Sequence, residues 1–162
     1  YKYTPVRVDK TEKDHERILV VGGGASARQF VESYREHNED DDLVVFGREP
    51  HGFYNRVLLP EYISEHRDWE NLRTAEDDIE ERLDMTAHWG TEIIELSPET
   101  KEVREDSGAI HGYDTLVLCT GSRAFVPPGV PYKADGIYTL RTRHNAERIK
   151  EAGGLQWDAL SP

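Results

Sequence analysis

Three consecutive glycines follow a short apolar run near the start of the chain. The run Arg17–Val21 leads into Gly22-Gly23-Gly24-Ala25-Ser26-Ala27, a G-x-G-x-x-A pattern between an expected strand and an expected helix. In that context the pattern is typical of a turn that binds the pyrophosphate of a dinucleotide. Gly22 would allow the tight turn, Gly24 would admit the phosphates, and Ala27 would permit close helix–strand packing. The alternative is a glycine-rich turn in an unrelated α/β protein.

The free N–H groups at the start of the expected helix would face the phosphates with the positive end of the helix dipole. A dinucleotide site also needs a group for the ribose after the second strand. The sequence there is Phe46-Gly47-Arg48-Glu49. Glu49 could hold ribose hydroxyls, Arg48 could instead attract a 2′-phosphate as in NADP, or both could be ordinary loop charges.

A fixed cation follows in the next loop. Arg56 lies in the stretch Gly52–Leu59, near the mouth of the expected unit. Its guanidinium could offset pyrophosphate charge with a forked hydrogen bond. Taken alone, this stretch is no more informative than other loops.

The elements that must position these residues follow from apolar patterning. Short apolar runs predict buried parallel strands, and spacings that share one face predict helices. Strand, helix and strand within about thirty residues form a βαβ unit. Three short segments separated by turn sequences predict a β-meander. The expected strands are Arg17–Val21, Leu43–Phe46, Met85–Trp89, Glu92–Leu96, Lys101–Glu105, Ala109–His111 and a buried Thr115–Cys119; the main expected helices are Ala25–His37, Thr74–Leu83 and Arg143–Ala152.

Two longer phrases extend these signals. One joins Phe46-Gly47-Arg48-Glu49-Pro50 to Tyr54-Asn55-Arg56-Val57-Leu58-Leu59, and the other runs from Tyr113 to Pro128 as YDTLVLCTGSRAFVPP. With the glycine pattern, and in this order, they resemble the FAD domain of the pyridine-nucleotide-dependent flavoprotein reductases. The likeness is greatest to the N-terminal part of the NAD(P)H nitrite reductase large subunit, and it covers about Arg17 to Lys150.

The resemblance implies FAD as the cofactor, with NAD(P)H as a co-substrate only if a missing domain supplies its site. Glu49 would then hold the adenosine ribose and Arg56 would lie near the phosphates or the flavin. A residue around Glu92 to Ile94 would touch the adenine edge. The remaining implied cofactor-binding residues are Gly22, Gly24, Ala25, Ser26 and Ala27 around the pyrophosphate and Thr120 and Gly121 beside the flavin. No catalytic residue is assigned.

The composition limits which classes of partner and cofactor the chain can be expected to bind. The chain has 162 residues and a formal net charge of −12, which indicates either a solvated surface or adaptation to a high-salt cytoplasm. Both interpretations argue against a nucleic-acid partner, which needs a basic patch. Seven scattered histidines lack metal-ligand spacing, and a single cysteine excludes an internal disulfide. No apolar window reaches the roughly 18 residues of a membrane span, so we expect a cytoplasmic protein.

We therefore predict an α/β, Rossmann-like three-layer domain with a meander crossover, incomplete at its C-terminus. We expect a polar tail over residues 1–16, a partial FAD-binding domain over 17–152 and a second tail over 153–162. The alternatives are a fold remnant without catalytic activity that acts through a partner chain, and a small NADP-binding domain. Surface left uncovered by absent parts would favour self-association or a partner chain.

Overall fold

A four-stranded parallel sheet forms the centre of the computed structural model, which describes residues 15–131, 134 and 136–153. Its order is β3-β2-β1-β7, and β1 pairs in parallel with both β2 and β7. The residues of β1 and β2 are almost all buried, as their unbroken apolar sequence predicts. The strand bounds are β1 Arg17–Val21, β2 Asp42–Gly47, β3 Met85–Trp89 and β7 Thr115–Leu118.

The two faces of this sheet are covered differently. Helices α1 (Ala25–Arg35) and α3 (Ile79–Arg82) pack on one face, where Ile18 and Val20 of β1 contribute to the core. The second, antiparallel sheet covers the other face, where Leu19 packs with Val103. Alternate residues of β1 thus point to opposite layers. The strands of the second sheet are β4 Ile93–Ser97, β5 Glu102–Glu105 and β6 Ile110–Gly112.

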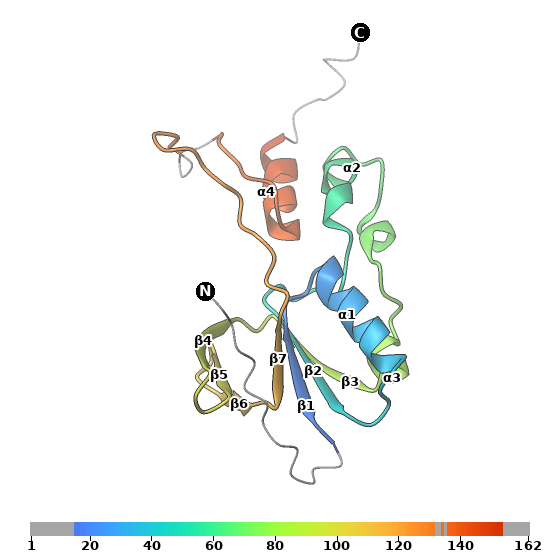
Figure 1. Ribbon diagram of the computed structural model, residues 1–162. Helices are drawn as coiled ribbons and strands as arrows, with labels where there is room; N and C mark the ends of the chain where they lie inside the picture. The colour runs from blue at the N-terminus through green and yellow to red at the C-terminus, as the bar shows by residue number, and fades with distance from the viewer. Residues whose placement is uncertain (1–14, 132–133, 135, 154–162) are drawn as a thin grey trace.

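The predicted three-layer fold with a meander crossover is therefore confirmed. The chain leaves β3, forms the antiparallel meander, and returns as β7 on the far side of β1. Figure 1 shows helices α1 and α3 on one side of the parallel sheet and strands β4, β5 and β6 on the other. The carboxyl ends of all four parallel strands meet at one edge of the sheet.

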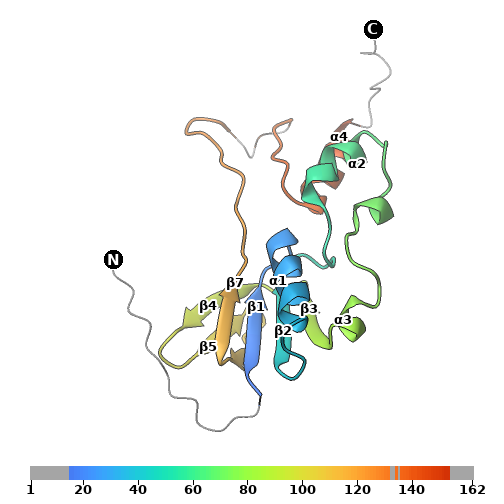
Figure 2. The same cartoon turned by 45° about the vertical axis from the view of Figure 1, so that its right-hand side comes forward.

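A smaller helical group lies beyond that edge. It comprises the 3₁₀ turns Arg56–Leu58 and Trp69–Leu72, helix α2 (Leu59–Ile63) and helix α4 (Arg143–Gly153), joined by the buried Tyr54, Leu59, Leu72 and Ala146. Helices α2 and α4 lie side by side in both views (Figures 1 and 2). Among the described residues, no helix has the length and apolar character needed to cross a membrane.

Two expectations about elements are wrong. The predicted helix Thr74–Leu83 is reduced to the single turn α3, because the N–H of Thr74 donates to the carbonyl of Phe53 and holds the start of the segment out of a helix. Strand β7 is not fully buried, since Leu118 is 60% exposed. Its other flank has no neighbouring strand among the described residues, and burial of an edge strand depends on what covers it.

Candidate functional site: a cavity at the carboxyl ends of the parallel strands

A cavity of about 310 Å³ opens at the carboxyl edge of the parallel sheet. Residues that follow β1, β2, β3 and β7 all contribute to its wall, so the site draws on the whole sheet. In open α/β sheets, ligands bind at this edge where the strand order reverses. Here β1 is the reversal point, because β2 lies on one side of it and β7 on the other. The lining residues are Val21, Gly22, Gly23, Phe46, Gly47, Arg48, Glu49, His51, Arg56, Thr91, Glu92, Ile93, Thr120, Gly121, Ser122 and Arg123.

The glycine turn brings β1 close to the end of β7. Gly22 has φ = +141°, and a Cβ there would lie 2.1 Å from the carbonyl oxygen of Cys119. Its N–H donates to the carbonyl of Phe46 at 2.8 Å, which ties the turn to β2. Only glycine fits this position, because both the backbone conformation and the contact exclude a side chain.

Within the described part of the chain, the hydrogen-bond donors at the start of helix α1 have no side-chain cap. Gly24 is the N-cap, no side chain caps the helix, and its first turn carries no acidic residue. A Cβ on Gly24 would meet nothing within 4 Å. Helix N-termini of this kind bind anions because their N–H groups and dipole favour negative charge. The room beside Gly24 and the uncapped donors together fit a phosphate group.

The structure brings five of the sequence-predicted site residues into the cavity wall: Gly22, Glu49, Arg56, Thr120 and Gly121. The others lie nearby or elsewhere. Ala25 and Ser26 are exposed in the first turn of α1, and Ala27 is fully buried against the sheet. The expected Ile94 is 60% exposed and does not belong to the residues that line the cavity. Its neighbour Ile93 lines the cavity, since neighbouring strand residues point to opposite faces.

Glu49 is enclosed by donors. Its carboxylate accepts a hydrogen bond from the Tyr54 hydroxyl at 2.8 Å and forms an ion pair with Arg56 at 2.5 Å. The backbone N–H of Arg143, at the start of α4, lies 3.4 Å from the same carboxylate and 3.1 Å from the Tyr54 hydroxyl oxygen. Burial, followed by the hydrogen bond to Glu49, raises the pKa of Tyr54 well above its usual value. The phenol therefore stays protonated and fixes Glu49 in place.

Arg143 connects this cluster to the helical group. Its guanidinium lies 4.0 Å from the ring centroid of Trp69 and pairs with Glu147 at 2.6 Å. It also approaches Nδ1 of His51 at 3.4 Å. Burial, and then the charge of Arg143, lowers the pKa of His51. His51 is thus held neutral near pH 7, and α4 is bound to the rim of the cavity.

Three cations and two acids line the cavity of a chain whose net charge is −12. Arg48 pairs with Glu92 at 3.5 Å, while Glu49 holds Arg56. Arg123 makes no hydrogen bond or ion pair with any residue in the part of the chain that the structure describes. The cavity is therefore locally richer in positive charge than the rest of the protein surface.

Sequence reasoning did not assign several of these residues. Three of them lie in the segments that follow strands of the parallel sheet: Thr91 comes shortly after β3, and Ser122 and Arg123 come shortly after β7. Their position after a strand end was therefore the signal that could have identified them. Arg143 offered no such signal. Its contacts with Glu49, Tyr54 and His51 span about ninety residues of sequence.

Comparison with known proteins gives the class of the molecule. Residues 16–156 match the family model described as pyridine nucleotide-disulphide oxidoreductase, so this chain belongs to that family. Cys119 is its single cysteine, and burial raises the pKa of that thiol. Residues 1–162 therefore contain no cysteine pair for disulfide chemistry.

Individual members of the family can be compared with this chain. An NAD(P)H nitrite reductase of Emericella nidulans is 35% identical over 152 residues, which are 89% of this chain and 14% of that protein. The ferredoxin–NAD(+) reductase component of 3-phenylpropionate/cinnamic acid dioxygenase from Photorhabdus laumondii is 27% identical, covering 85% of this chain and 35% of that one. This chain thus spans between a seventh and about a third of these relatives.

Solved structures agree on the fold. NADH:rubredoxin oxidoreductase from Clostridium acetobutylicum superposes with a TM-score of 0.73 at 25% identity, over 85% of this chain and 35% of that chain. The putidaredoxin reductase–putidaredoxin complex gives a TM-score of 0.76 at 22% identity, over 84% and 34%. The second likeness concerns the fold alone.

Proposed function

We propose that this chain is the FAD-binding part of an NAD(P)H-dependent flavoprotein oxidoreductase of the nitrite reductase kind. The observation that carries the proposal is the uncapped start of α1 beyond Gly22 and Gly24, beside a cavity lined by arginines. Family membership and the likeness to NAD(P)H nitrite reductases support the same conclusion.

The residues present fit a dinucleotide. The first-turn N–H groups of α1 would hold the pyrophosphate, and Gly24 leaves room for its approach. Arg123 would offset phosphate charge, and Arg56 would be held in position by Glu49. The adenosine half would lie over the ends of β2 and β3, and the flavin half over the end of β7.

Bound FAD would supply hydride uptake and single-electron release. This chain's share is to bind the dinucleotide, orient it and set the electrostatics around it. The sites for NAD(P)H and for the electron acceptor would be built from residues other than these 162. The exposed Leu118 and Phe125 suit a covering chain, either the rest of the enzyme or a second copy.

A small NADP-binding domain is the second candidate. Arg48 lines the cavity at the end of β2, where an arginine accommodates the 2′-phosphate of NADP. Tight NADPH binding without flavin binding would favour this candidate.

A flavin titration in high salt tests the proposal, read by tryptophan quenching and the visible spectrum. We expect saturable FAD binding, with a Kd on the order of 10 µM or tighter. Gly24→Asp should abolish it, because a carboxylate would occupy the phosphate position. Gly112→Asp adds the same charge on β6, outside the cavity wall, and should bind FAD normally. Absence of FAD binding to the wild-type chain would contradict the proposal.

A further inference from the structure

We propose that Glu92, together with Arg48, recognises the adenosine ribose, and that Glu49 is a positioning residue. The inference rests on the proposed function and identifies the part of the cavity that would bind the adenosine ribose. It replaces the sequence-based expectation for Glu49. The pair would select an adenosine whose ribose carries no 2′-phosphate, as in FAD.

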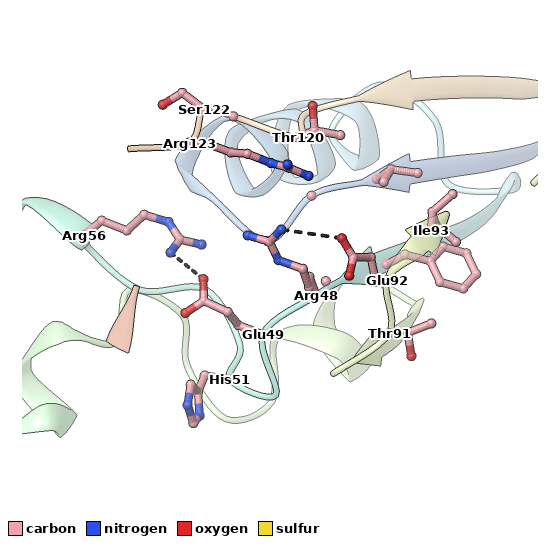
Figure 3. A pocket seen from close by; sticks show the side chains of 16 residues that line it. Arg48, Glu49, His51, Arg56, Thr91, Glu92, Ile93, Thr120, Ser122 and Arg123 are labelled. Atoms are coloured by element: carbon pink, nitrogen blue, oxygen red, sulfur yellow. Dashed lines mark hydrogen bonds and ion pairs between the residues drawn. The ribbon is translucent and has the colours of Figure 1, made fainter. Parts of the chain in front are cut away.

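Glu49 has little capacity left for a ligand. Its two oxygens already face Arg56, the Tyr54 hydroxyl and the N–H of Arg143, and its side chain is only 17% exposed. A carboxylate has about four acceptor positions. In Figure 3, Glu49 is directed toward Arg56, away from Arg48 and Glu92. Its role is to orient Arg56 and the start of α4.

The usual place for a ribose acid, at the end of β2, cannot hold a side chain here. Gly47 is the last residue of β2, and a Cβ on it would lie 2.5 Å from Cε3 of Trp89. The Trp89 indole is itself fixed, because its N–H donates to Glu80 at 3.0 Å. The acid must therefore come from a neighbouring element.

Glu92 meets that requirement. It lines the cavity just before β4, and its carboxylate lies 3.5 Å from a guanidinium nitrogen of Arg48, with side chains 44% and 53% exposed. Figure 3 shows the Glu92 carboxylate directed at the Arg48 guanidinium. The Glu92 carbonyl accepts the N–H of Asp106 at 2.9 Å, so its backbone is anchored while its carboxylate stays accessible.

The chemistry of the pair selects the ribose. A carboxylate accepts hydrogen bonds from vicinal ribose hydroxyls, and an exposed ion pair opens at little cost to admit them. A 2′-phosphate would instead place its negative charge against Glu92. Arg48 alone would attract that phosphate, but Glu92 compensates its charge. The opposite charges of Glu92 and Arg48 would therefore favour an adenosine with a free 2′-hydroxyl, as in FAD, over one with a 2′-phosphate, as in NADP.

Calorimetric titration with ADP, 2′-deoxy-ADP and 2′,5′-ADP tests this in the 162-residue chain. We expect the wild type to prefer ADP over 2′-deoxy-ADP by roughly tenfold, since Glu92 loses a charge-assisted hydrogen bond from the missing hydroxyl. Glu92→Gln should reduce that ratio to near unity and strengthen 2′,5′-ADP binding several-fold relative to ADP. Arg48→Gln should weaken 2′,5′-ADP most.

Two controls separate the roles. Glu49→Gln should lower the affinity for all three nucleotides and keep their ratios. Glu95→Gln removes an exposed acid on β4 that pairs with Arg104, and should change neither affinity nor ratio. A ratio that survives Glu92→Gln, or one that is lost in Glu49→Gln, overturns the inference alone. Failure of the wild type to bind FAD or ADP overturns the proposed function and the inference with it.

Discussion

The two ends of the parallel sheet each hold an acid beside a tyrosine, yet they differ in what remains unsatisfied. At the amino end, Asp41 accepts hydrogen bonds from the Tyr34 hydroxyl, from the N–H of Glu16 at 2.7 Å and from the Asn38 amide at 2.7 Å. At the carboxyl end, Glu49 is enclosed by Tyr54 and Arg56. The two clusters look alike as hydrogen-bond networks.

The cations distinguish them. Arg35, at the amino end, donates to four backbone carbonyls, among them Leu83 and Asp84 at 2.7 Å each. At the carboxyl end, Arg48 has one partner at 3.5 Å, and Arg123 has none within the described part of the chain. A buried acid–tyrosine pair therefore does not by itself mark a functional site. Arginines that line a cavity and have few partners do mark such a site, because their guanidinium groups can still donate hydrogen bonds to a ligand.

The largest expected effect is at the turn that joins the carboxyl ends of β1 and β7. Gly22→Ala would place a Cβ 2.1 Å from the Cys119 carbonyl oxygen at φ = +141°. Strain and overpacking together should lower the free energy of unfolding by about 3 kcal/mol. Urea unfolding measures it.

Gly24→Ala is the matched control for that change. A Cβ there meets nothing within 4 Å, and the backbone is extended at φ = −104°, ψ = −175°. We expect stability within about 0.5 kcal/mol of wild type. Equal losses in the two variants would mean that the β1–β7 approach does not require glycine at position 22.

A matched pair of tyrosine variants compares the two networks directly. Tyr54 is 3% exposed, and its hydroxyl donates to Glu49 and accepts from Arg56 and from the Arg143 N–H, so Tyr54→Phe would remove all three hydrogen bonds. We expect a loss of about 2 kcal/mol in unfolding free energy. Tyr34→Phe should lose about 1 kcal/mol, because among the described residues that hydroxyl makes a single hydrogen bond, to Asp41, which keeps its other two donors. A larger loss for Tyr34→Phe in urea titrations would reverse the comparison.

Sequence patterning predicted the buried part of the fold well. Strands β1 and β2 appear within one residue of their apolar runs, because strands covered on both faces must be apolar throughout. The same pattern misjudged the burial of β7, since a run of apolar residues does not say whether an edge is covered. The helix over Thr74–Leu83 failed because a tertiary hydrogen bond overrode local propensity.

The candidate site was predictable where it depends on strand ends. Gly22, Glu49 and Arg56 reach the cavity because they follow β1 and β2. Ile93 and Ile94 could not be separated, since a shift of one residue moves a side chain to the opposite face and β4 contains an irregularity between Ile93 and Glu95. One of the contacts that hold Glu49 in place comes from the N–H of Arg143, and no local sequence pattern indicates that these two residues meet.

A smaller effect, present at neutral pH and lost in acid, should appear at the amino end. Burial alone would raise the pKa of Asp41, but hydrogen bonds from Tyr34, Glu16 and Asn38 hold it below the usual value. A lowered pKa stabilises the fold above the unfolded value of about 3.9, and the gain is lost as pH falls through the folded pKa.

Asp41→Asn tests that linkage. The variant should be less stable than wild type at pH 7, by less than Tyr54→Phe, and the difference should shrink below about pH 4. Asp40→Asn removes an exposed neighbouring charge and serves as the control. Unfolding curves at a series of pH values measure both. A difference that is constant with pH would assign the effect to packing rather than to ionisation.

The smallest effect on stability is expected at Arg123, a residue of the cavity wall whose replacement should mainly change ligand binding. Arg123→Gln should change the free energy of unfolding by less than about 0.5 kcal/mol, because the described residues offer that side chain no partner. FAD affinity should nevertheless fall roughly threefold to tenfold at low salt, and the gap should narrow as salt screens the charge. Arg104→Gln removes a cation that pairs with Glu95 on the meander and should leave binding unchanged. Loss of stability without loss of affinity in Arg123→Gln would make this arginine part of the fold, and the carboxyl end would then resemble the amino end after all.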